Sequence, residues 1–458
     1  MINLSCQAIA EIVQGRLVGA NVQINSVSTD SRNINPGQLF IALTGPNFDA
    51  ANFVADVKAQ GATAVIVERP VDVDISQIIV ADSRIALGQL GAAVKAKLAL
   101  PCVAVTGSAG KTTVKEMMAA ILTCSGSVLA TKGNFNNDIG LPLTLLALTE
   151  QHKYAVLELG ANHQGEIAYT TALAKPDVAI ITNVAASHLE GFGSVAGVAT
   201  AKCEIFLGLA SDGVAIIPAD SEFTPFWLQR LVGKKVQQFS ASQVTDYYAT
   251  DIVLAADGCA RFMLHTPQGD IAITLTLPGK HNVNNALAAA AGCMNLGASL
   301  GQVQLALASM PQVKGRTNVL QVSPELRIID DSYNANVESV KAAIDLLASY
   351  EGLQILVLGD MGELGADARL YHEEIGFYAK KSGINLLFTL GVLSQSASDL
   401  LQQQGAHFSS RQALVSRLLA TINEQQKVTL LVKGSRSAKM ELVVQDLLES
   451  CQQEINPC

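Results

Sequence analysis

Residues 103–113 read Val-Ala-Val-Thr-Gly-Ser-Ala-Gly-Lys-Thr-Thr, a short β-branched strand followed by a glycine turn and the start of a polar segment. Gly107 and Gly110 let backbone N–H groups approach a polyphosphate closely. Lys111 adds a mobile cation, and the hydroxyl of Thr112 is a candidate ligand of Mg²⁺. The stretch therefore predicts a nucleotide-binding α/β domain.

The spacing of this loop is shorter than in the usual GxxxxGK[ST] pattern, because Val105 stands where the first glycine of that pattern belongs. The alternative to a phosphate loop is an ordinary strand, turn and helix with a glycine hinge. A Gly-Lys-Thr-Thr sequence directly after an apolar strand favours the phosphate loop.

Length and composition indicate a multidomain α/β protein. The chain has 458 residues, of which 49% are apolar and 16% are charged. This length predicts about three domains, and the composition excludes a disordered chain and suits buried parallel sheets flanked by helices. The net charge of −9 disfavours binding to nucleic acid or to an anionic membrane surface. An anionic ligand must therefore be held by local cations and backbone dipoles.

The cysteines and the N-terminus indicate a cytoplasmic protein. The eight cysteines show no CxxC pair and no histidine at metal spacing, so we expect reduced thiols at positions 6, 102, 124, 203, 259, 293, 451 and 458. The first six residues lack the basic and apolar regions of a secretory signal. The most apolar helical segment, 284–297, is too short and too polar to cross a bilayer. We expect a cytoplasmic monomer without membrane insertion.

Three consecutive segments carry the strand and helix patterns. Residues 1–82 have short apolar runs separated by turns, which predicts a small α/β module. In residues 83–313, apolar strands alternate with helical segments, which predicts a parallel sheet. Residues 314–458 repeat that alternation and predict a Rossmann-like, doubly wound sheet. The segment 83–98 has helical periodicity and leads into the phosphate strand.

Hydrophobic periodicity places the elements of the two larger segments. In the central segment we expect strands at 103–106, 155–159 and 178–184, and helices at 113–123, 195–209 and 283–296. In the last segment we expect strands at 326–330, 354–358, 385–390 and 428–432, and helices at 337–348 and 370–381. Ligands of such sheets sit beyond the carboxyl ends of the strands, so polar residues there are functional candidates.

Two strand ends carry candidate metal ligands. The strand at 155–159 ends around Glu158, and the strand at 178–184 leads to His188. If the sheet is parallel, both meet the phosphate loop at one edge and could join Thr112 around a divalent cation, for which Mg²⁺ prefers oxygen ligands. The alternatives are a charge at a helix N-terminus for Glu158 and a capping or buried histidine for His188.

Further candidates lie in polar segments. The loop 133–142 concentrates amides and a carboxylate, which suits a polar substrate with sugar or peptide groups, or Asx turns alone. Asn282 and Asn285 lie one turn apart at the start of an alanine-rich helix, where either could cap the helix or contact a base. Arg316 at the second linker and Asp331 at a strand end suggest a site assembled by domain closure.

Lys202 lies in an amphipathic helix that starts near Val195. A lysine in such a position is usually a solvated surface residue. Spacing alone gives it no function.

The motifs, taken together and in order, resemble those of the bacterial Mur ligases. They are TGSAGKTT (106–113), NFNNDIGLP (134–142), ELGANHQGEI (158–167), SHLEGFGS (187–194), AKCEIF (201–206), PGKHNVNNALAAA (278–290), DDSYNAN (330–336), LGDMGELG (358–365) and KGSRSAKM (433–440). The similarity spans nearly the whole chain. The family loop has the same compressed TGxxGKT form, which accounts for Val105.

The resemblance implies an ATP-dependent amide ligase that uses Mg²⁺. Within the family, the strings are most similar to members that join D-alanyl-D-alanine to UDP-N-acetylmuramoyl-tripeptide, and next to members that add the third residue of that peptide. The implied reaction forms an acyl phosphate from the tripeptide carboxylate and ATP, and the dipeptide amine then displaces phosphate. The implied division of labour is substrate binding by residues 1–82, ATP binding by 83–313, and completion of the ATP site with dipeptide binding by 314–458.

By matching position, the resemblance also implies residue roles. Thr112 and Glu158 correspond to ligands of one Mg²⁺, and His188 and Lys202 to ligands of a second. Lys202 corresponds to the lysine that the family carbamylates, a change that turns an ammonium into an anionic oxygen ligand. The expected catalytic residues are Lys111, Lys202, His188 and Glu158. The expected ATP-binding residues are Thr106, Gly107, Ser108, Ala109, Gly110, Lys111, Thr112, Thr113, Asn282, Asn285, Arg316 and Asp331.

The resemblance places the UDP-substrate contacts in the first segment. The expected residues are Ser28, Thr29, Asp30, Ser31, Arg32, Thr44, Gly45, Asn47, Phe48 and Asp49, with Asn134, Asn136, Asn137 and Asp138 for the muramoyl-peptide part. The chain departs from the family at one position. Relatives commonly carry a histidine where this chain has Ala51, so one contact of that pocket is missing.

A regulatory P-loop NTPase switch is the competing functional class. It predicts slow hydrolysis that is independent of any amine, and the lack of an Asn-Lys-x-Asp motif disfavours its GTPase form. Folylpolyglutamate synthase resembles the central segment, but the motifs of the first and last segments argue against it.

Overall fold

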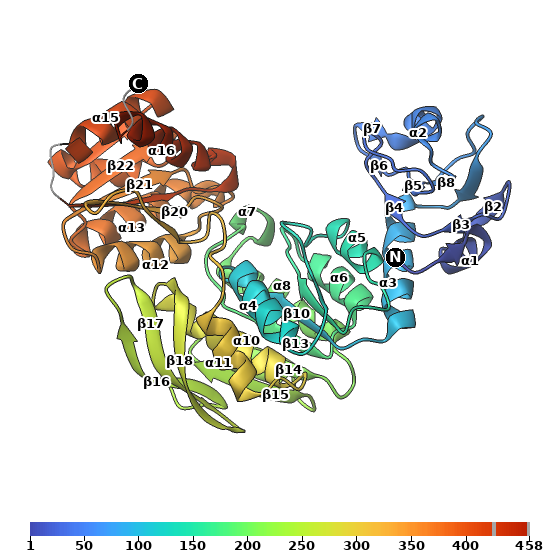
Figure 1. The fold of residues 1–458 in the computed structure, drawn as a ribbon, viewed down its shortest axis with the longest axis horizontal. Coiled ribbons are helices and arrows are strands. Elements are labelled where there is room, and N and C mark those ends of the chain that lie inside the picture. Colours follow the sequence, from blue (N-terminus) through green and yellow to red (C-terminus); the bar gives the residue numbers. More distant parts are fainter. Residues whose placement is uncertain (424–426, 456–458) are drawn as a thin grey trace.

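The computed structural model describes residues 1–423 and 427–455. Within these residues, three β-sheets of five or more strands follow one another along the chain. Figure 1 shows the α/β regions that contain them, with the blue N-terminal region and the red C-terminal region at opposite ends and the green and yellow central region between them. The predicted α/β class is confirmed.

The central sheet has nine strands. From edge to edge they are β11 (Val128–Ala130), β12 (Tyr154–Glu158), β10 (Cys102–Thr106), β13 (Val178–Ile181), β14 (Val214–Pro218), β15 (Lys235–Ser240), β16 (Tyr247–Leu254), β17 (Cys259–Thr266) and β18 (Gly269–Pro278). The strands from β11 to β16 pair in parallel, whereas β16, β17 and β18 pair antiparallel.

The predicted parallel sheet is therefore confirmed for β11 to β16, whereas the last strands extend it as an antiparallel part that was not predicted. Four residues join β16 to β17 and two join β17 to β18, and connections this short can join antiparallel neighbours only. The burial of β17 alternates along most of its length, as expected for a strand with one face exposed.

Helices cover both faces of the parallel part of the central sheet. Val103 and Val105 of β10 pack in one core cluster with α4 (Lys111–Thr123), α10 (His281–Met294) and α11 (Leu300–Ala308). Cys102 and Ala104, which alternate with them, face α5 (Gly140–Leu146), α6 (Glu166–Ala174) and α8 (Val195–Cys203). The shorter helices are α7 (Leu189–Phe192), the 3₁₀ turn η2 (Glu204–Gly208) and α9 (Thr224–Arg230).

The N-terminal region contains a five-stranded sheet. Its strands are β2 (Arg16–Val18), β9 (Ser76–Ile79), β8 (Ala64–Val67), β5 (Leu39–Ile41) and β4 (Val27–Ser28). Two small pairs accompany it, β1 (Leu4–Ser5) with β3 (Gln23–Ile24) and β6 (Thr44–Gly45) with β7 (Phe48–Asp49). The helices are α1 (Cys6–Ile12), the 3₁₀ turn η1 (Ala50–Phe53) and α2 (Val54–Gln60).

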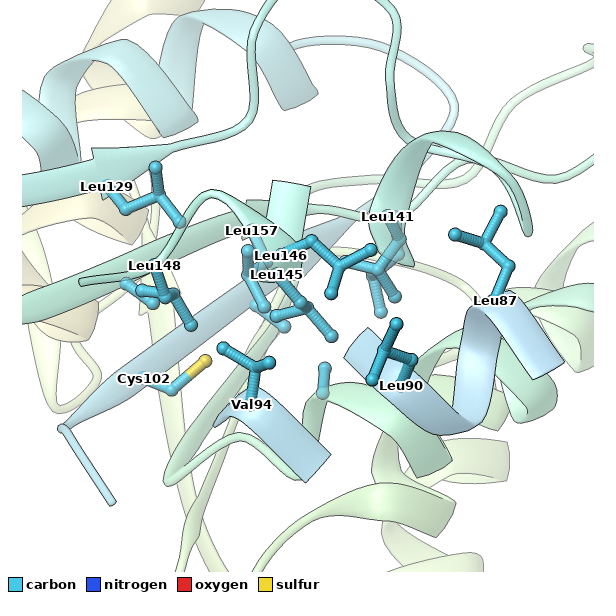
Figure 2. Close-up of a cluster of buried hydrophobic side chains, with 14 of the residues drawn as sticks. Leu87, Leu90, Val94, Cys102, Leu129, Leu141, Leu145, Leu146, Leu148 and Leu157 are labelled. Atoms are coloured by element: carbon cyan, nitrogen blue, oxygen red, sulfur yellow. The ribbon is translucent and has the colours of Figure 1, made fainter. Parts of the chain in front are cut away.

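Helix α3 (Ser83–Leu98) joins the N-terminal region to the central one through a shared apolar core. Figure 2 shows Leu90 and Val94 of α3 directed toward Leu145 of α5 and Leu157 of β12. The same cluster of buried side chains continues to Ile66 of β8. The predicted bounds of this helix, 83–98, are confirmed.

The C-terminal sheet has six strands. Their order is β19 (Asn318–Gln321), β20 (Leu326–Asp331), β24 (Val428–Lys433), β21 (Leu353–Gly359), β22 (Leu386–Leu390) and β23 (Gly405–Phe408). All neighbours pair in parallel except β19 and β20. One face is covered by α12 (Val337–Ala348), α13 (Ala368–Lys381) and α14 (Gln395–Asp399), and the other by α15 (Arg411–Asn423) and α16 (Glu441–Ile455).

Most predicted strands and helices of the two larger segments end within two residues of the observed bounds. Two do not. Strand β13 stops at Ile181 rather than 184, because the next two residues bind the phosphate loop. Helix α8 stops at Cys203 rather than 209, and the chain continues as a 3₁₀ turn whose Glu204 carboxylate accepts hydrogen bonds from the start of α6.

The division into residues 1–82, 83–313 and 314–458 remains a proposal. It is supported by the sheets, each of which falls within one of these segments.

Cys6, Cys102, Cys203 and Cys293 are buried and form no disulfide with any described residue, while Cys458 lies outside the described residues. Burial raises the pKa of the Cys102 thiol to about 12, so this thiol stays protonated and unreactive. Every helix in the described part of the chain falls short of the length and apolarity that a bilayer-spanning segment requires.

Leu145→Ala is expected to destabilise the shared core by about 2–5 kcal/mol, because it leaves a cavity at a fully buried position. Urea unfolding followed by the fluorescence of Trp227 measures the effect, since this single tryptophan is buried in the same cluster. Leu305→Ala is the control: this side chain is 63% exposed, and its loss should change stability by about 0.5 kcal/mol or less. Equal unfolding midpoints for Leu145→Ala and the control would contradict the role of this core.

Candidate active site

The loop between β10 and α4 has a backbone that requires glycine at two positions. Gly107 and Gly110 have φ angles of 150° and 78°. A Cβ atom on Gly107 would lie 1.9 Å from the Thr182 hydroxyl, and one on Gly110 would lie 2.5 Å from Asn285 Oδ1. Helix α4 begins directly after this turn, so its unpaired N–H groups and positive dipole end face the loop, as in a phosphate site.

Residues that follow β13 hold this loop in place. Asn183 Oδ1 accepts a hydrogen bond from Ala109 N at 2.8 Å, and Thr182 Oγ1 donates to Ala109 O at 2.6 Å. Strands β12 and β13 flank β10 on its two sides in parallel. The prediction that both strand ends share the edge of the phosphate loop is therefore confirmed.

Two of the predicted loop residues use their hydroxyls within the protein. Thr106 is fully buried and donates to Leu159 O at 2.7 Å. Ser108 donates to Ala185 O at 3.2 Å and accepts from Ser187 Oγ at 3.0 Å. Their side chains shape the loop, and any contact to a phosphate must come from their backbone.

The Lys111 ammonium folds back onto its own loop. Its Nζ donates to Gly107 O at 2.7 Å, and burial lowers its pKa. This position places the cation at the glycine turn, where the β- and γ-phosphates bind in P-loop proteins.

Thr112 and Glu158 bring two oxygen atoms to one point beside the loop. Thr112 Oγ1 donates to Glu158 Oε2 at 2.9 Å, and Asn136 Nδ2 donates to Glu158 Oε1 at 2.9 Å. Mg²⁺ is typically bound by one or two protein oxygens, with phosphates and waters completing the octahedron. The pair fits that mode. No group of three or more His, Cys, Asp and Glu side chains within residues 1–423 and 427–455 forms an all-protein metal cage.

The position of Lys202 in a helix had suggested a solvated surface residue. In the structure its side chain is buried, with 1% exposure. Its Nζ lies 5.2 Å from the centre of the Phe192 ring. Burial, with a smaller contribution from Lys111, lowers its pKa to about 7. With a pKa near 7, a substantial fraction of this amine is unprotonated near neutral pH, and the unprotonated amine is a nucleophile.

His188 stands at the start of α7 and faces the C-terminal region. Its ring lies edge-on to Phe192, with centroids 6.3 Å apart, so the histidine and Lys202 approach the same aromatic ring. Its Nδ1 is in ion-pair contact with Glu363, and that contact lowers the pKa of the Glu363 carboxyl. The capping alternative for His188 does not apply, because its side chain caps no N–H of α7.

A cavity of about 560 Å³ lies between the central and C-terminal regions. Seven of the predicted ATP-binding residues line it, namely Ala109, Gly110, Thr113, Asn282, Asn285, Arg316 and Asp331. Asn285 Nδ2 donates to Asn282 Oδ1 at 2.8 Å, and Asn282 Nδ2 donates to Pro278 O at 2.8 Å. These bonds orient both amides at the start of α10. The volume lies in the range of small-molecule and cofactor sites.

Arg316 places a cation at the cavity wall. Its Nη2 donates to Thr112 Oγ1 at 3.3 Å, and its guanidinium stacks 4.2 Å from the centre of the Tyr333 ring. Its Nε is buried and has no hydrogen-bond partner among the described residues. An anion in the cavity could satisfy this donor.

Asp331 is paired with a buried lysine that the sequence analysis did not assign. Lys433 Nζ donates to Asp331 Oδ2 at 2.6 Å and to Asn334 O at 2.9 Å, and Asp331 Oδ1 accepts from Thr317 N at 3.0 Å. Burial lowers the pKa of Lys433, although Asp331 opposes that shift. Lys433 begins the quoted KGSRSAKM motif at the end of a predicted strand, and this position could have marked it as a site residue.

Two further cavity residues and one contact between the regions were missed for different reasons. His281 lies in the quoted PGKHNVNNALAAA motif, two residues before the predicted helix; it lines the cavity, and burial lowers its pKa. Asn183 carries no motif apart from its place at a strand end. Asn336 Nδ2 donates to Ser108 O at 3.1 Å across the regions, a contact that no local pattern could indicate.

The predicted UDP-substrate residues lie in the N-terminal region and do not line this cavity. Arg32 binds Asp30 through two hydrogen bonds of 2.8 and 2.9 Å, which lower the pKa of Asp30 to about 2. Asp49 pairs with Arg69 at 2.8 Å and accepts from Ala51 N at 2.8 Å. Ala51 itself is buried in a core cluster.

The loop after β11 is divided between two kinds of contact. Asn136 reaches Glu158, and Phe135 is 51% exposed beside it. Asn137 Oδ1 instead accepts from Gly140 N at 2.8 Å at the start of α5, which is the Asx-turn alternative. Asp138 is in ion-pair contact with Arg84 of α3.

Comparison with protein families matches nearly the whole chain. The model described as "Mur ligase family, catalytic domain" matches residues 23–121, "Mur ligase middle domain" matches 105–293, and "Mur ligase, glutamate ligase domain" matches 315–436. The chain is 48% identical over 451 residues to the UDP-N-acetylmuramoyl-tripeptide–D-alanyl-D-alanine ligase of Escherichia coli strain K12, which covers 98% of this chain and 99% of that protein.

Two solved structures share the whole fold. A crystal structure of MurF from Acinetobacter baumannii has a TM-score of 0.94 at 39% identity and covers 98% of this chain and 99% of that one. A MurF ligase from Thermotoga maritima in complex with ADP has a TM-score of 0.84 at 27% identity and covers 94% of this chain and 98% of that one.

Lys433→Met is expected to destabilise the C-terminal region by about 3–5 kcal/mol, because it leaves the buried Asp331 carboxylate without its partner. Hydrogen exchange followed by mass spectrometry should show faster exchange in β20 and β24. Lys427→Met, which breaks the exposed pair with Glu351, is the control and should leave exchange unchanged. Unchanged protection of β20 in Lys433→Met would show that the buried pair does not stabilise the sheet.

Proposed function

The chain belongs to the Mur ligase family, and from this membership we propose that it joins D-alanyl-D-alanine to UDP-N-acetylmuramoyl-tripeptide with hydrolysis of ATP to ADP and phosphate. The observation that carries the proposal is the cavity beyond the phosphate loop, which residues of the C-terminal region complete. The relatives that share both the sequence and the full fold are named for this activity. The product is the pentapeptide precursor of peptidoglycan.

The reaction balances as two displacements. A tripeptide carboxylate oxygen attacks the γ-phosphorus of ATP, the bond to the β-phosphate oxygen breaks, and ADP leaves. The amine of the dipeptide then attacks the carbonyl carbon of the acyl phosphate, loses a proton and displaces inorganic phosphate. Holding both substrates beside the nucleotide turns a three-component reaction into an intramolecular one.

The main obstacle to this chemistry is electrostatic repulsion between a carboxylate and a triphosphate. The positive groups of the site reduce that repulsion. Lys111 lies at the glycine turn, and the unpaired Nε of Arg316 is buried at the cavity wall. The N-terminus of α4 adds its dipole. Fixed cations and N–H groups aimed at the transferring phosphoryl group stabilise the charge that develops in the transition state.

The nucleotide occupies the cavity in this proposal. Asn282 and Asn285 contact the adenine, Arg316 the γ-phosphate, and Asp331 the ribose and phosphates. The ADP bound to the Thermotoga relative supports adenine nucleotide as the ligand of this fold. Thr112 and Glu158 would hold one Mg²⁺, which when bound neutralises phosphate charge and orients the oxygens.

The UDP-substrate enters from the N-terminal region in this proposal. The Ser28–Arg32 segment and the β6–β7 pair contact the UDP part, and Asn134, Asn136 and Asp138 contact the muramoyl-peptide. Because residue 51 is alanine, the pocket lacks the histidine that relatives commonly carry and relies on Asp49 and its neighbours. We further propose a cytoplasmic monomer.

We propose that Lys202 is N-carboxylated. Its neutral amine nitrogen attacks the carbon of CO₂, an N–C bond forms and a proton leaves to water. The burial of Lys202 and the lowered pKa of its amine support this step, since only the unprotonated amine reacts. The resulting carbamate oxygen, together with His188, would hold a second Mg²⁺.

Phosphate release should require the UDP-muramoyl-tripeptide and D-alanyl-D-alanine together, since each half reaction needs its own acceptor. A coupled phosphate assay with each substrate omitted in turn measures this. The control tests for the ligase that adds the third residue. It uses UDP-muramoyl-dipeptide in place of the tripeptide, and a single amino acid in place of D-alanyl-D-alanine. Turnover that is unchanged without any amine would instead indicate an NTPase switch.

Lys202→Ala should lose most of the ligase activity and regain part of it with added small carboxylates, while Lys202→Glu should retain some activity without bicarbonate. In the wild type, ¹³C-bicarbonate should give a carbamate NMR signal that Lys202→Ala lacks. The folded pKa lies below the ordinary 10.5, so the amine loses its proton as pH rises through about 7, and the signal should grow over that range. Wild-type activity in Lys202→Ala would refute the carbamate.

A further inference from the structure

Glu363 of the C-terminal region contacts His188 of the central region. His188 Nδ1 is buried and has no hydrogen-bond partner of regular geometry among the described residues, but the Glu363 carboxylate is in ion-pair contact with it. The backbone supports the contact, since Glu190 N donates to Glu363 O at 3.4 Å. Glu363 lies in the loop that follows β21, so the contact forms only when the two regions are together. Neither the sequence motif nor the proposed reaction gives Glu363 a role.

The chemistry of this contact determines which ring nitrogen is free. An ionised carboxylate can only accept hydrogen bonds, so Nδ1 of a neutral His188 must carry the hydrogen and Nε2 keeps its lone pair. A metal-binding histidine usually has this arrangement, in which a carboxylate accepts from one nitrogen while the other binds the metal. The hydrogen bond at one nitrogen sets the tautomer and the orientation of the ring.

Both partners adopt backbone conformations that side chains rarely take. His188 has φ 51° and Glu363 has φ 62°, both in the left-handed region. Such conformations persist where the surrounding structure holds them, and they cluster at functional contacts. A hydrogen bond also fixes the loop that carries Glu363: Met361 N donates at 2.9 Å to Nε2 of the fully buried His372.

We propose that Glu363 is a positioning residue that fixes the tautomer and orientation of His188 and so couples closure of the C-terminal region to assembly of the second metal site. The inference rests on the proposed function, since it takes His188 as a metal ligand. When the region is open, His188 has no carboxylate at Nδ1 and is not prepared for the metal. Closure therefore completes the metal site at the same time as it completes the cavity.

The test uses the full chain with a non-hydrolysable ATP analogue and Mn²⁺ as the probe. Titration of Mn²⁺ by electron paramagnetic resonance should show a second site that is about 10- to 100-fold weaker in Glu363→Ala than in the wild type. Glu363→Gln, whose amide oxygen still accepts from Nδ1–H, should bind more tightly than Glu363→Ala. Without Mn²⁺, ¹⁵N-histidine NMR should show His188 protonated at Nδ1 in the wild type and at Nε2 in Glu363→Ala.

Two controls make the result specific. Asp367→Asn removes an exposed carboxylate four residues further on, at the end of the 3₁₀ turn that precedes α13. Its side chain caps no helix N–H, so this change should leave the second site unchanged. The double variant His188→Ala with Glu363→Ala should bind no more weakly than His188→Ala alone, because the two residues act as one unit. Additive losses, or equal weakening by Glu363→Gln and Glu363→Ala, would overturn the positioning role.

Failure of this inference can be told apart from failure of the proposed function. A wild type that ligates both substrates but has the same second-site affinity and His188 tautomer as Glu363→Ala overturns the inference and leaves the ligase assignment standing. A wild type that releases no phosphate with both substrates overturns the ligase assignment, and the inference falls with it.

Discussion

The structure depends on one electrostatic constraint: a chain with a net charge of −9 must gather a triphosphate and a carboxylate at one point. The overall field opposes this, so the positive charge has to be local. Lys111, Arg316 and Lys433 supply it, and the N-terminus of α4 adds backbone N–H groups. Burial lowers the pKa of Lys111 and of Lys433, as expected for ammonium groups that are removed from water.

The same constraint explains why the site lies between two regions rather than within one. In the central sheet, β12 and β13 flank the strand that leads into the phosphate loop. The cavity lies on the side of the loop where α10 begins. The C-terminal region closes that side with Asp331, Lys433 and the segment that carries Arg316. Its sheet is doubly wound, so its own carboxyl strand ends face the cavity.

Local sequence signals predicted the parts of the site that depend on strand ends. Glu158 and Asp331 were found because a polar residue directly follows an apolar run, and the parallel sheet then brought Glu158 to Thr112. Lys202 and Glu363 could not be placed in this way. The burial of Lys202 depends on how α8 packs under Phe192, and the contact of Glu363 joins residues 175 positions apart in different regions. The antiparallel strands β16–β18 were missed for a simpler reason, since no strand was predicted between residues 210 and 282.

The two junctions between regions differ in kind, and that difference bears on catalysis. The N-terminal region shares a continuous apolar core with the central one through α3 (Figure 2). Among the described residues, the apolar clusters of the C-terminal region include one residue of the central region, Ala186, which is only partly buried. Its attachment rests instead on polar contacts such as Asn336 to Ser108 and Arg316 to Thr112. Polar contacts of this kind are individually weak, so we expect this junction to separate more readily than the apolar one. Such a junction suits a ligase, because its nucleotide and product must leave the cavity between the two regions.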